Sequence, residues 1–158
     1  MRRIAVVAAV LLVSAGAGAA PGSAQEPDAG ESRAGSFTSG VARSTTLGSC
    51  KTVTAWRGFR LFFLQTYAWK YFERISWCYN GRRLTSFTYR RWPEVYVPTW
   101  DFKGHIGFQA SGGEGSRSAR RWTQGKFRQC AAWCFQTKTP WVDLLVRRDG
   151  SWSYATGG

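Results

Sequence analysis

The sequence predicts an all-β domain, an antiparallel β-sandwich or barrel of about eight short strands that disulfides stabilise. Three observations predict it. Aromatic residues, which favour strands, are concentrated after Cys50, with 24 of the chain's 25 in that stretch. Turn signals recur there roughly every ten to fifteen residues, and no segment carries a sustained helical stripe with caps. All four cysteines lie in the same stretch.

The first 24 residues have the three parts of a secretory signal peptide. Two arginines follow Met1, an apolar core runs over residues 4–13, and small residues continue to Ala24. The unbroken apolar core has about half of the ~20 residues that a membrane-spanning helix needs. We therefore expect cleavage after Ala24, or alternatively after Ala19, and a secreted, extracellular protein without a membrane anchor.

Residues 25–47 are predicted to form a disordered linker. They are rich in small and polar residues, and Phe37 is their only aromatic residue. Such a segment buries too little apolar surface to offset the entropy that ordering costs. The alternative is a strand that docks on the domain around Phe37 and Val41. The basic, aromatic-rich β domain itself is expected over residues 48–158, a length suited to a single core.

The four cysteines are predicted to form two disulfides. An even number of cysteines in an exported chain favours disulfides over a structural zinc site. Cys130 and Cys134 fit opposite positions of a hairpin with residues 131–133 as its loop, since directly opposed side chains are close enough to be bridged. Cys50 is then left to pair with Cys78, and a crossed pairing is the alternative.

Two dipeptides mark tight turns between strands. Asn80-Gly81 and Asp149-Gly150 are typical of type I′ hairpins, in which both central residues have positive φ. Two-residue loops at these positions predict cross-strand pairs that include Tyr79–Arg82, Trp77–Leu84 and Arg147–Trp152. The first hairpin then has an apolar face made of Ile75, Trp77, Tyr79 and Leu84.

Other strands are predicted from their β-branched and aromatic content. They cover residues 51–56, 61–71, 96–100, 105–110 and 119–126. The segment around 61–71 also fits helical spacing through its leucines. We favour the strand there because its aromatic residues and Thr66 suit a pleated sheet.

The domain is strongly basic. Residues 50–158 contain 18 Lys and Arg against six Asp and Glu, and a charge of this size attracts phosphates, acidic polymers and anionic lipid headgroups. Many cations directly adjoin an aromatic residue, and strand alternation then predicts the ring inward and the cation outward. The nine tryptophans exceed what a core of this size needs, because each buried indole N–H requires a partner. Some of them are therefore expected at the surface.

Trp133 is the first candidate binding residue, at the tip of the predicted disulfide-closed hairpin. A rigid aromatic tip with a cationic rim loses little entropy on binding. The alternative is that Trp133 folds back onto the core. The rim residues expected on the exposed face of this hairpin are Lys126, Arg128 and Lys138. A second candidate surface consists of Arg90, Arg91 and Trp92.

His105 is the only histidine of the chain. With Glu73 or Glu94 and an arginine it would supply the acid, the base and the cations that cleavage of RNA requires. Sequence alone does not bring these residues together. The acidic residues are too dispersed to predict a metal site, and no motif predicts a cofactor.

Four segments resemble small exported proteins of actinomycete bacteria: Trp77–Gly81, Phe102–Ile106, Gln124–Phe127 and Pro140–Asp143. The resemblance spans most of residues 50–143. It implies secretion and a bacterial source, and it implies no catalytic or binding residue.

We therefore expect a secreted, monomeric, non-enzymatic module that binds an anionic extracellular polymer or the cell envelope. Cell-wall glycan or teichoic acid is favoured over nucleic acid as the ligand. The alternatives are a secreted ribonuclease-like enzyme that uses His105, a cationic antibacterial protein, and a protease inhibitor that presents the Cys130–Cys134 loop.

Overall fold

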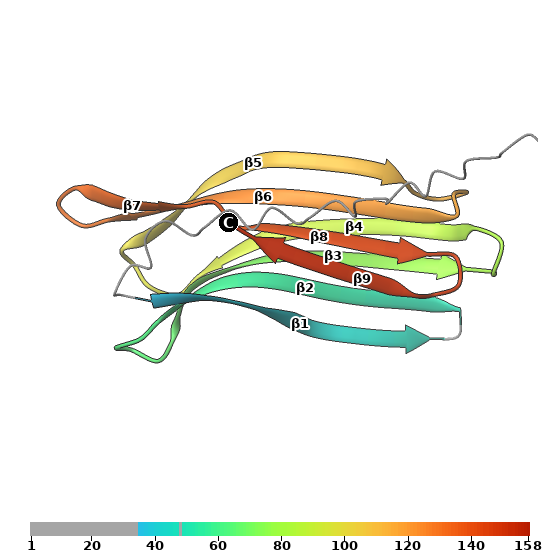
Figure 1. Cartoon of the computed structure of the whole chain (residues 1–158), viewed down its shortest axis with the longest axis horizontal. Helices are drawn as coiled ribbons and strands as arrows, with labels where there is room; N and C mark the ends of the chain where they lie inside the picture. Colours follow the sequence, from blue (N-terminus) through green and yellow to red (C-terminus); the bar gives the residue numbers. More distant parts are fainter. Residues whose placement is uncertain (1–34, 48) are drawn as a thin grey trace, which may run out of the picture. The chain divides into compact units, whose positions relative to one another are not determined.

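Nine antiparallel strands in two sheets make up the described part of the chain (Figure 1). The structure is a computed structural model, and it describes residues 35–47 and 49–158. The first sheet has the order β1-β2-β3-β4, and the second has the order β5-β6-β8-β9 with β7 also paired to β6. The strands are β1 (Gly35–Leu47), β2 (Cys50–Leu61), β3 (Tyr67–Tyr79), β4 (Leu84–Val95), β5 (Trp100–Gly112), β6 (Ser118–Cys130), β7 (Cys134–Lys138), β8 (Trp141–Arg147) and β9 (Trp152–Gly157).

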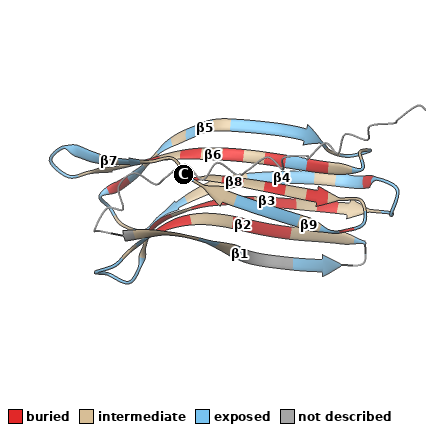
Figure 2. Cartoon of the chain, viewed as in Figure 1, coloured by how far each residue is buried: buried red, intermediate tan, exposed pale blue. Residues whose placement is uncertain are grey.

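The two sheets pack face to face around one core, which confirms the prediction of an all-β antiparallel sandwich and excludes the closed barrel. The buried positions gather on the central strands β2, β3, β6 and β8 (Figure 2). Along β3 they alternate, so that Trp69, Tyr71, Ile75 and Trp77 point between the sheets. The intervening residues of β3 form part of the outer face of the first sheet.

The strands β7 and β8 lie one after the other along the same side of β6. β7 pairs with residues 127–130 of β6, and β8 pairs with residues 118–124. Pro140 lies between the two strands and has no N–H to donate to a ladder. Its carbonyl accepts a hydrogen bond from the Gly125 N–H, so the chain stays attached to β6 across the break.

Three tryptophans lie in the core with at most 2% of their surface exposed: Trp69, Trp77 and Trp100. Their indole N–H groups have no hydrogen-bond partner among the described residues. The expectation that a buried indole must be paired is therefore wrong for these three. The Trp69 ring stacks on Phe59 and Phe127 and meets Trp100 edge-on, and these contacts stabilise the core in spite of the unpaired donors.

The predicted linker is corrected for residues 35–47, which form β1 and pair with β2 along almost its whole length. The docked strand around Phe37 and Val41 is the alternative that the structure shows. Phe37 packs against Phe59 and Trp69, with ring centroids 5.4 and 6.1 Å apart. Ladder hydrogen bonds do not depend on composition, so the scarcity of apolar residues was misleading. The predicted signal peptide and residues 25–34 lie outside the described residues.

The β3–β4 turn is longer than predicted and spans residues 80–83. Tyr79 pairs with Leu84 instead of Arg82, so the predicted pair of Trp77 with Leu84 is wrong. The Asn80 side chain accepts hydrogen bonds from two backbone N–H groups of the loop, which stabilises the wider turn. The predicted apolar face nevertheless forms, because Trp77 and Leu84 are both buried.

The β8–β9 turn differs from the prediction by one residue. Trp152 pairs with Val146 rather than with Arg147. The Arg147 N–H donates to the Ser151 carbonyl, which leaves a three-residue loop. Gly150 closes this loop with a φ of 79°, a left-handed conformation that glycine adopts without strain.

The predicted strand over residues 61–71 is confirmed for residues 67–71 and wrong for residues 62–66, and its helical alternative is wrong. β2 ends at Leu61, residues 62–66 form an exposed turn, and β3 begins at Tyr67. Most of the predicted strand 96–100 is likewise a turn, which connects the first sheet to the second. Both segments carry strand-forming residue types, but the chain reverses or changes sheet there, so they leave the ladders.

Both predicted disulfides are confirmed. Cys50 is bonded to Cys78 and Cys130 to Cys134, and no cysteine is free. Each disulfide joins directly opposed residues of neighbouring strands. Two disulfides indicate an oxidising environment of the extracellular type. Within the described ranges, no helix is long and apolar enough to cross a membrane.

Removing the Cys50–Cys78 disulfide is expected to lower the free energy of unfolding by roughly 3–4 kcal/mol, because it closes the longer chain loop. Removing the Cys130–Cys134 disulfide, which spans only four residues in sequence, is expected to cost about 2 kcal/mol. Chemical unfolding of the two double Cys→Ser variants measures both losses. Equal losses, or a larger loss for the shorter loop, would contradict this account.

Candidate functional site

The outer face of the first sheet carries three aromatic side chains in one row. Trp56 of β2 lies directly opposite Phe72 of β3, and Phe72 lies directly opposite Trp92 of β4. The rings of Phe72 and Trp92 stack with centroids 5.0 Å apart and an interplanar angle of 5°. Trp56 and Trp92 are half-buried, whereas Phe72 between them is only 7% exposed. The row therefore presents two accessible indoles on an open sheet face.

Two glycines leave the space that the Trp56 indole occupies. Gly40 of β1 lies directly opposite Trp56, and a Cβ atom there would come within 3.2 Å of the indole ring. A Cβ atom on Gly58 would lie 3.1 Å from the same ring. Both contacts are tighter than ordinary packing, so side chains at these positions would displace the indole.

Three cations lie over these aromatic rings. The Lys70 Nζ is 4.5 Å from the centroid of a Trp56 ring and 4.0 Å from that of Tyr67. The guanidinium carbons of Arg74 and Arg90 lie 5.1 and 5.5 Å from a ring centroid of Trp92. These distances are typical of cation–π interactions. We call the set the aromatic platform: Trp56, Phe72, Trp92, Lys70, Arg74 and Arg90.

Glu94 is the acidic residue beside the aromatic platform. Its carboxylate accepts hydrogen bonds from the Trp92 indole N–H and from the Tyr96 hydroxyl. These hydrogen bonds hold the pKa of Glu94 below its ordinary value. The carboxylate is therefore ionised, and it orients the Trp92 ring from one side.

A row of hydroxyl groups continues the same face beyond the arginines. The Thr52 and Ser76 hydroxyl oxygens are 2.8 Å apart, and Arg74 Nε donates to the Thr54 hydroxyl at 2.9 Å. Together with Thr45 and Thr88, Thr52 and Ser76 line a shallow hollow of about 260 Å³ beside the Cys50–Cys78 disulfide. The outer face thus combines fixed cations with hydrogen-bonding hydroxyl groups.

The second predicted surface is only partly assembled. Arg90 and Trp92 belong to the aromatic platform, but Arg91 lies between them on β4 and points to the other face. Its Nη1 donates to the Gly107 carbonyl at 3.2 Å, and its guanidinium lies 5.1 Å from the Phe108 ring centroid. Arg91 is therefore removed from this candidate surface.

The first predicted surface, around Trp133, is also only partly assembled. Trp133 is 72% exposed, so it does not fold back onto the core. Arg128 lines a shallow hollow of about 400 Å³ together with Phe135 and Thr137 of β7. Lys126 lies two residues before Arg128 and shares its face by strand alternation.

Lys138 does not lie on the rim of the hairpin as predicted. A bulge at Gln129 and Cys130 shifts the register, so that Lys138 pairs with Phe127. Its Nζ lies 5.0 Å from the ring centroid of Phe37 and 5.4 Å from that of Phe59. Without the bulge, the predicted three-residue loop would place Lys126 opposite Lys138 and Arg128 opposite Gln136, whereas Arg128 pairs with Thr137 and Gln136 with Gln129.

The prediction that rings point inward and their neighbouring cations outward holds for Trp69 and Lys70 but fails at three other doublets. Arg57, Arg91 and Arg121 point inward, while the tryptophans beside them lie on the outer faces. Trp122, for example, covers Gly107, where a Cβ atom would come within 2.6 Å of the ring. The inward arginines are stabilised by aromatic rings and backbone carbonyls; Arg121 Nη1 donates to the Ser111 carbonyl at 3.0 Å.

A polar cluster lies between the sheets, near the edge that β4 and β5 form. Glu73 is fully buried, and the Thr123 hydroxyl donates to its Oε2 at 2.8 Å. Burial raises the pKa of Glu73 to about 8. The Tyr71 hydroxyl is 2.8 Å from His105 Nδ1, and burial raises the pKa of Tyr71. Burial, and then the positive charge of Arg91, lowers the pKa of His105.

This geometry does not favour the ribonuclease-like alternative. A general base must reach the proton that it abstracts, and the Glu73 carboxyl is fully buried. Glu94, the other candidate base, is engaged by Trp92 and Tyr96 on the outer face of the first sheet. His105 therefore has no accessible carboxylate partner among the residues that the sequence suggested. Among the residues that the structure describes, no group of three or more His, Cys, Asp or Glu is arranged to hold a metal.

Sequence reasoning missed Trp56, Phe72, Lys70 and Arg74 as members of the site. Nothing in their local sequence sets them apart, because they come from two strands. The signal that unites them is the β2–β3 and β3–β4 register, which aligns residues 56, 72 and 92. That register depends on the true turn lengths, which the sequence did not reveal.

Comparison of the chain with protein-family models, curated proteins and solved structures gives no match. The resemblance to exported actinomycete proteins therefore stays a prediction. The function has to be inferred from the geometry and charge of the molecule's own surfaces.

Proposed function

We propose that the protein binds an anionic extracellular polymer on the aromatic platform. The observation that carries this proposal is the row of Trp56, Phe72 and Trp92 on an open sheet face, with a cation over each of the two accessible indoles. Cell-wall glycan or teichoic acid is the ligand class that we favour, and nucleic acid ranks second. We propose that the protein acts after secretion and without catalysis.

The aromatic rings support this proposal by holding the cations in place before the ligand arrives. A lysine or arginine side chain loses considerable rotamer entropy when it is immobilised in a complex. Lys70, Arg74 and Arg90 already pack on ring faces, so part of that loss is incurred on folding. Their charged groups remain available to carboxylate or phosphate groups of a ligand.

The row of hydroxyls favours a hydroxyl-rich polyanion over nucleic acid. Thr52, Ser76 and Thr88 lie beside the cations and offer hydrogen bonds to sugar or polyol hydroxyl groups. Nucleic-acid bases, by contrast, bind single-strand platforms by stacking on open ring faces. The indoles of Trp56 and Trp92 already contact cations, which makes them less suited to base stacking.

The double variant Arg74→Ala and Arg90→Ala is expected to weaken binding to teichoic-acid-bearing wall material at least tenfold. The tenfold change corresponds to a loss of about 1.4 kcal/mol. The matched control is Arg82→Ala with Arg83→Ala, which removes the same charge from the exposed β3–β4 turn. The control is expected to weaken binding less than threefold in a pull-down at constant ionic strength.

Trp92→Leu tests the role of the rings, because it preserves the net charge. We expect it to weaken binding, because Arg74 and Arg90 lose the ring on which they pack. The factor should be smaller than for the double arginine variant, because both positive charges remain. If the control weakens binding as much as the platform variant, binding depends only on net charge and the assigned site is wrong. If neither variant changes retention, the proposal of polymer binding at this face fails.

A further inference from the structure

Five large apolar side chains are exposed in two segments outside the core. In the β2–β3 loop, Phe63 is 87% exposed, Leu64 63% and Phe62 53%. In and beside the β6–β7 hairpin loop, Trp133 is 72% exposed and Phe135 57%. Large apolar side chains that are exposed together in this way mark an interaction surface. We call the five residues the apolar tips.

Both loops project from the same end of the two sheets (Figure 1). The turn over residues 96–99 makes backbone hydrogen bonds both to β3, which follows the first loop, and to β6, which precedes the second. The Tyr96 N–H donates to the Ala68 carbonyl at the start of β3, and the Cys130 N–H donates to the Thr99 carbonyl at the end of β6. The apolar tips therefore extend from one end of the fold on two separate loops, the β2–β3 loop and the β6–β7 hairpin loop, which we call the two prongs.

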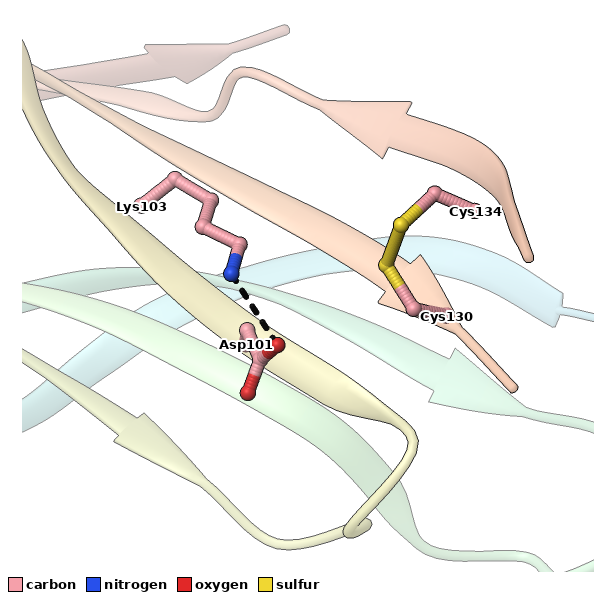
Figure 3. Close-up of a disulfide and its surroundings, with 4 residues drawn as sticks. All are labelled: Asp101, Lys103, Cys130 and Cys134. Carbon is pink, nitrogen blue, oxygen red and sulfur yellow. Dashed lines mark hydrogen bonds and ion pairs between the residues drawn. A yellow bond between two sulfur atoms is a disulfide. The ribbon is translucent and has the colours of Figure 1, made fainter. Parts of the chain in front are cut away.

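Each prong is held in shape by its own local interactions. The Cys130–Cys134 disulfide closes the β6–β7 hairpin (Figure 3), and Trp133 immediately precedes Cys134 in the sequence. In the other prong, the Leu61 N–H donates to the Thr66 carbonyl, and Gln65 has a φ of 48°. A non-glycine residue in the left-handed region is uncommon and is typical of functional loops. The exposed rings are thus displayed by ordered loops.

The surroundings of the prongs are basic. Residues 62–66 and 131–133 contain no acidic residue. Arg60 precedes the first prong, and Arg128 lies in the hollow beside the second. Asp101, the acidic residue near the hairpin, is paired with Lys103 at 3.1 Å (Figure 3).

We propose that this end of the protein docks on a lipid bilayer rich in anionic phospholipid, with the apolar tips inserted among the headgroups. Tryptophan and phenylalanine beside Arg and Lys match the membrane interface, where an apolar layer lies beneath anionic groups. A bilayer accepts apolar side chains without shape complementarity, so apolar side chains on two separate loops suit a lipid surface. This function is distinct from polymer binding on the aromatic platform.

The test measures co-sedimentation of the oxidised protein with phosphatidylglycerol–phosphatidylcholine vesicles and with phosphatidylcholine vesicles. We expect binding to the anionic vesicles only. The triple variant Phe63→Ser, Leu64→Ser and Trp133→Ser is expected to lower the partition coefficient at least tenfold. The control is Leu47→Ser, which replaces an 85% exposed leucine at the end of β1, at the opposite end of the strands, and it is expected to change the partition coefficient less than twofold.

Trp133 also provides an optical readout. Lipids brominated on their acyl chains quench the fluorescence of inserted indoles, so we expect quenching of the wild-type protein and a large loss of that quenching in Trp133→Phe. Absence of wild-type binding to anionic vesicles would overturn the proposal. An equal loss of vesicle binding in the Leu47 control would also overturn it. If the tip variants bound vesicles normally but no longer attached to whole cells, the ligand would be a protein and the proposal would be wrong.

A further comparison separates the two surfaces. Arg74→Ala with Arg90→Ala is expected to change vesicle binding less than threefold, and the tip variants are expected to retain polymer binding. If only the arginine variant lost vesicle binding, the membrane contact would belong to the aromatic platform and the proposed docking end would be wrong.

Discussion

Replacement of Glu73 by Gln is expected to remove most of the pH dependence of the domain's stability between about pH 4.5 and 8. The carboxyl is fully buried between the sheets, and its only described hydrogen bond comes from the Thr123 hydroxyl to Oε2. Burial raises the pKa of Glu73 from its ordinary value of 4.5 to about 8. The folded protein therefore carries a proton there that the unfolded chain releases near pH 4.5.

The sign of the effect follows from proton linkage. Between these two values the folded state binds more protons than the unfolded state, so the free energy of unfolding falls as the pH rises. The stabilising effect is complete below about pH 4.5 and is lost by about pH 8. Its full size is on the order of 4–5 kcal/mol, because each pKa unit corresponds to ~1.4 kcal/mol.

Other groups in the same cluster also affect the pH dependence of stability. The positive charges of Arg91 and Arg121 lower the pKa of Glu73, while the negative charge of Asp143 raises it. The pKa of His105 is lowered from its ordinary value of 6.5, so His105 makes the protein more stable as the pH rises toward that value. Its effect opposes that of Glu73, and for this reason the wild-type protein must be compared with a Glu73 variant.

Chemical unfolding of wild type and Glu73→Gln at pH 5 and pH 8 measures the effect. We expect similar stabilities at pH 5 and a variant that is more stable than wild type by several kcal/mol at pH 8. Glu94→Gln is the control, since the pKa of this exposed carboxyl is lowered rather than raised. Parallel pH profiles for wild type and Glu73→Gln would show that Glu73 is ionised in the folded protein, contrary to this account.

Trp69→Ala is expected to lower the free energy of unfolding by about 3–5 kcal/mol, as truncation of a large core aromatic does. Trp69 of β3 is fully buried and stacks on Phe127 of the second sheet, with centroids 4.2 Å apart. It also contacts Phe37 of β1 and Trp100 of β5. One side chain thus joins both sheets and the N-terminal strand.

Trp133→Ala is the matched control, because it makes the same chemical change at a 72% exposed site. Its expected effect on stability is within about 0.5 kcal/mol. Trp69→Phe is expected to cost less than Trp69→Ala, since it keeps a ring in the stack and removes an indole N–H that has no partner among the described residues. Equal unfolding midpoints for Trp69→Ala and Trp133→Ala would show that the stack does not stabilise the sandwich.

The candidate site was only partly predictable. Arg90, Trp92, Trp133 and Arg128 were singled out by their charge or ring character, and the structure leaves all four on outer surfaces. Arg91 and Lys138 were misplaced because strand pairing puts them on the inner side. The rest of the aromatic platform could not be found from the sequence, since it exists only where three strands align.

The amino-acid sequence by itself determined the all-β class and both disulfide pairs. Strand propensity, turn dipeptides and the parity and spacing of cysteines are local properties that survive small errors in register. Only the tertiary structure decided which tryptophans and arginines face outward. A bulge such as that at Gln129 and Cys130, or a loop one residue longer than expected, moves side chains to the opposite face of a sheet. The cross-strand ladder also ordered β1, whose composition alone predicts disorder.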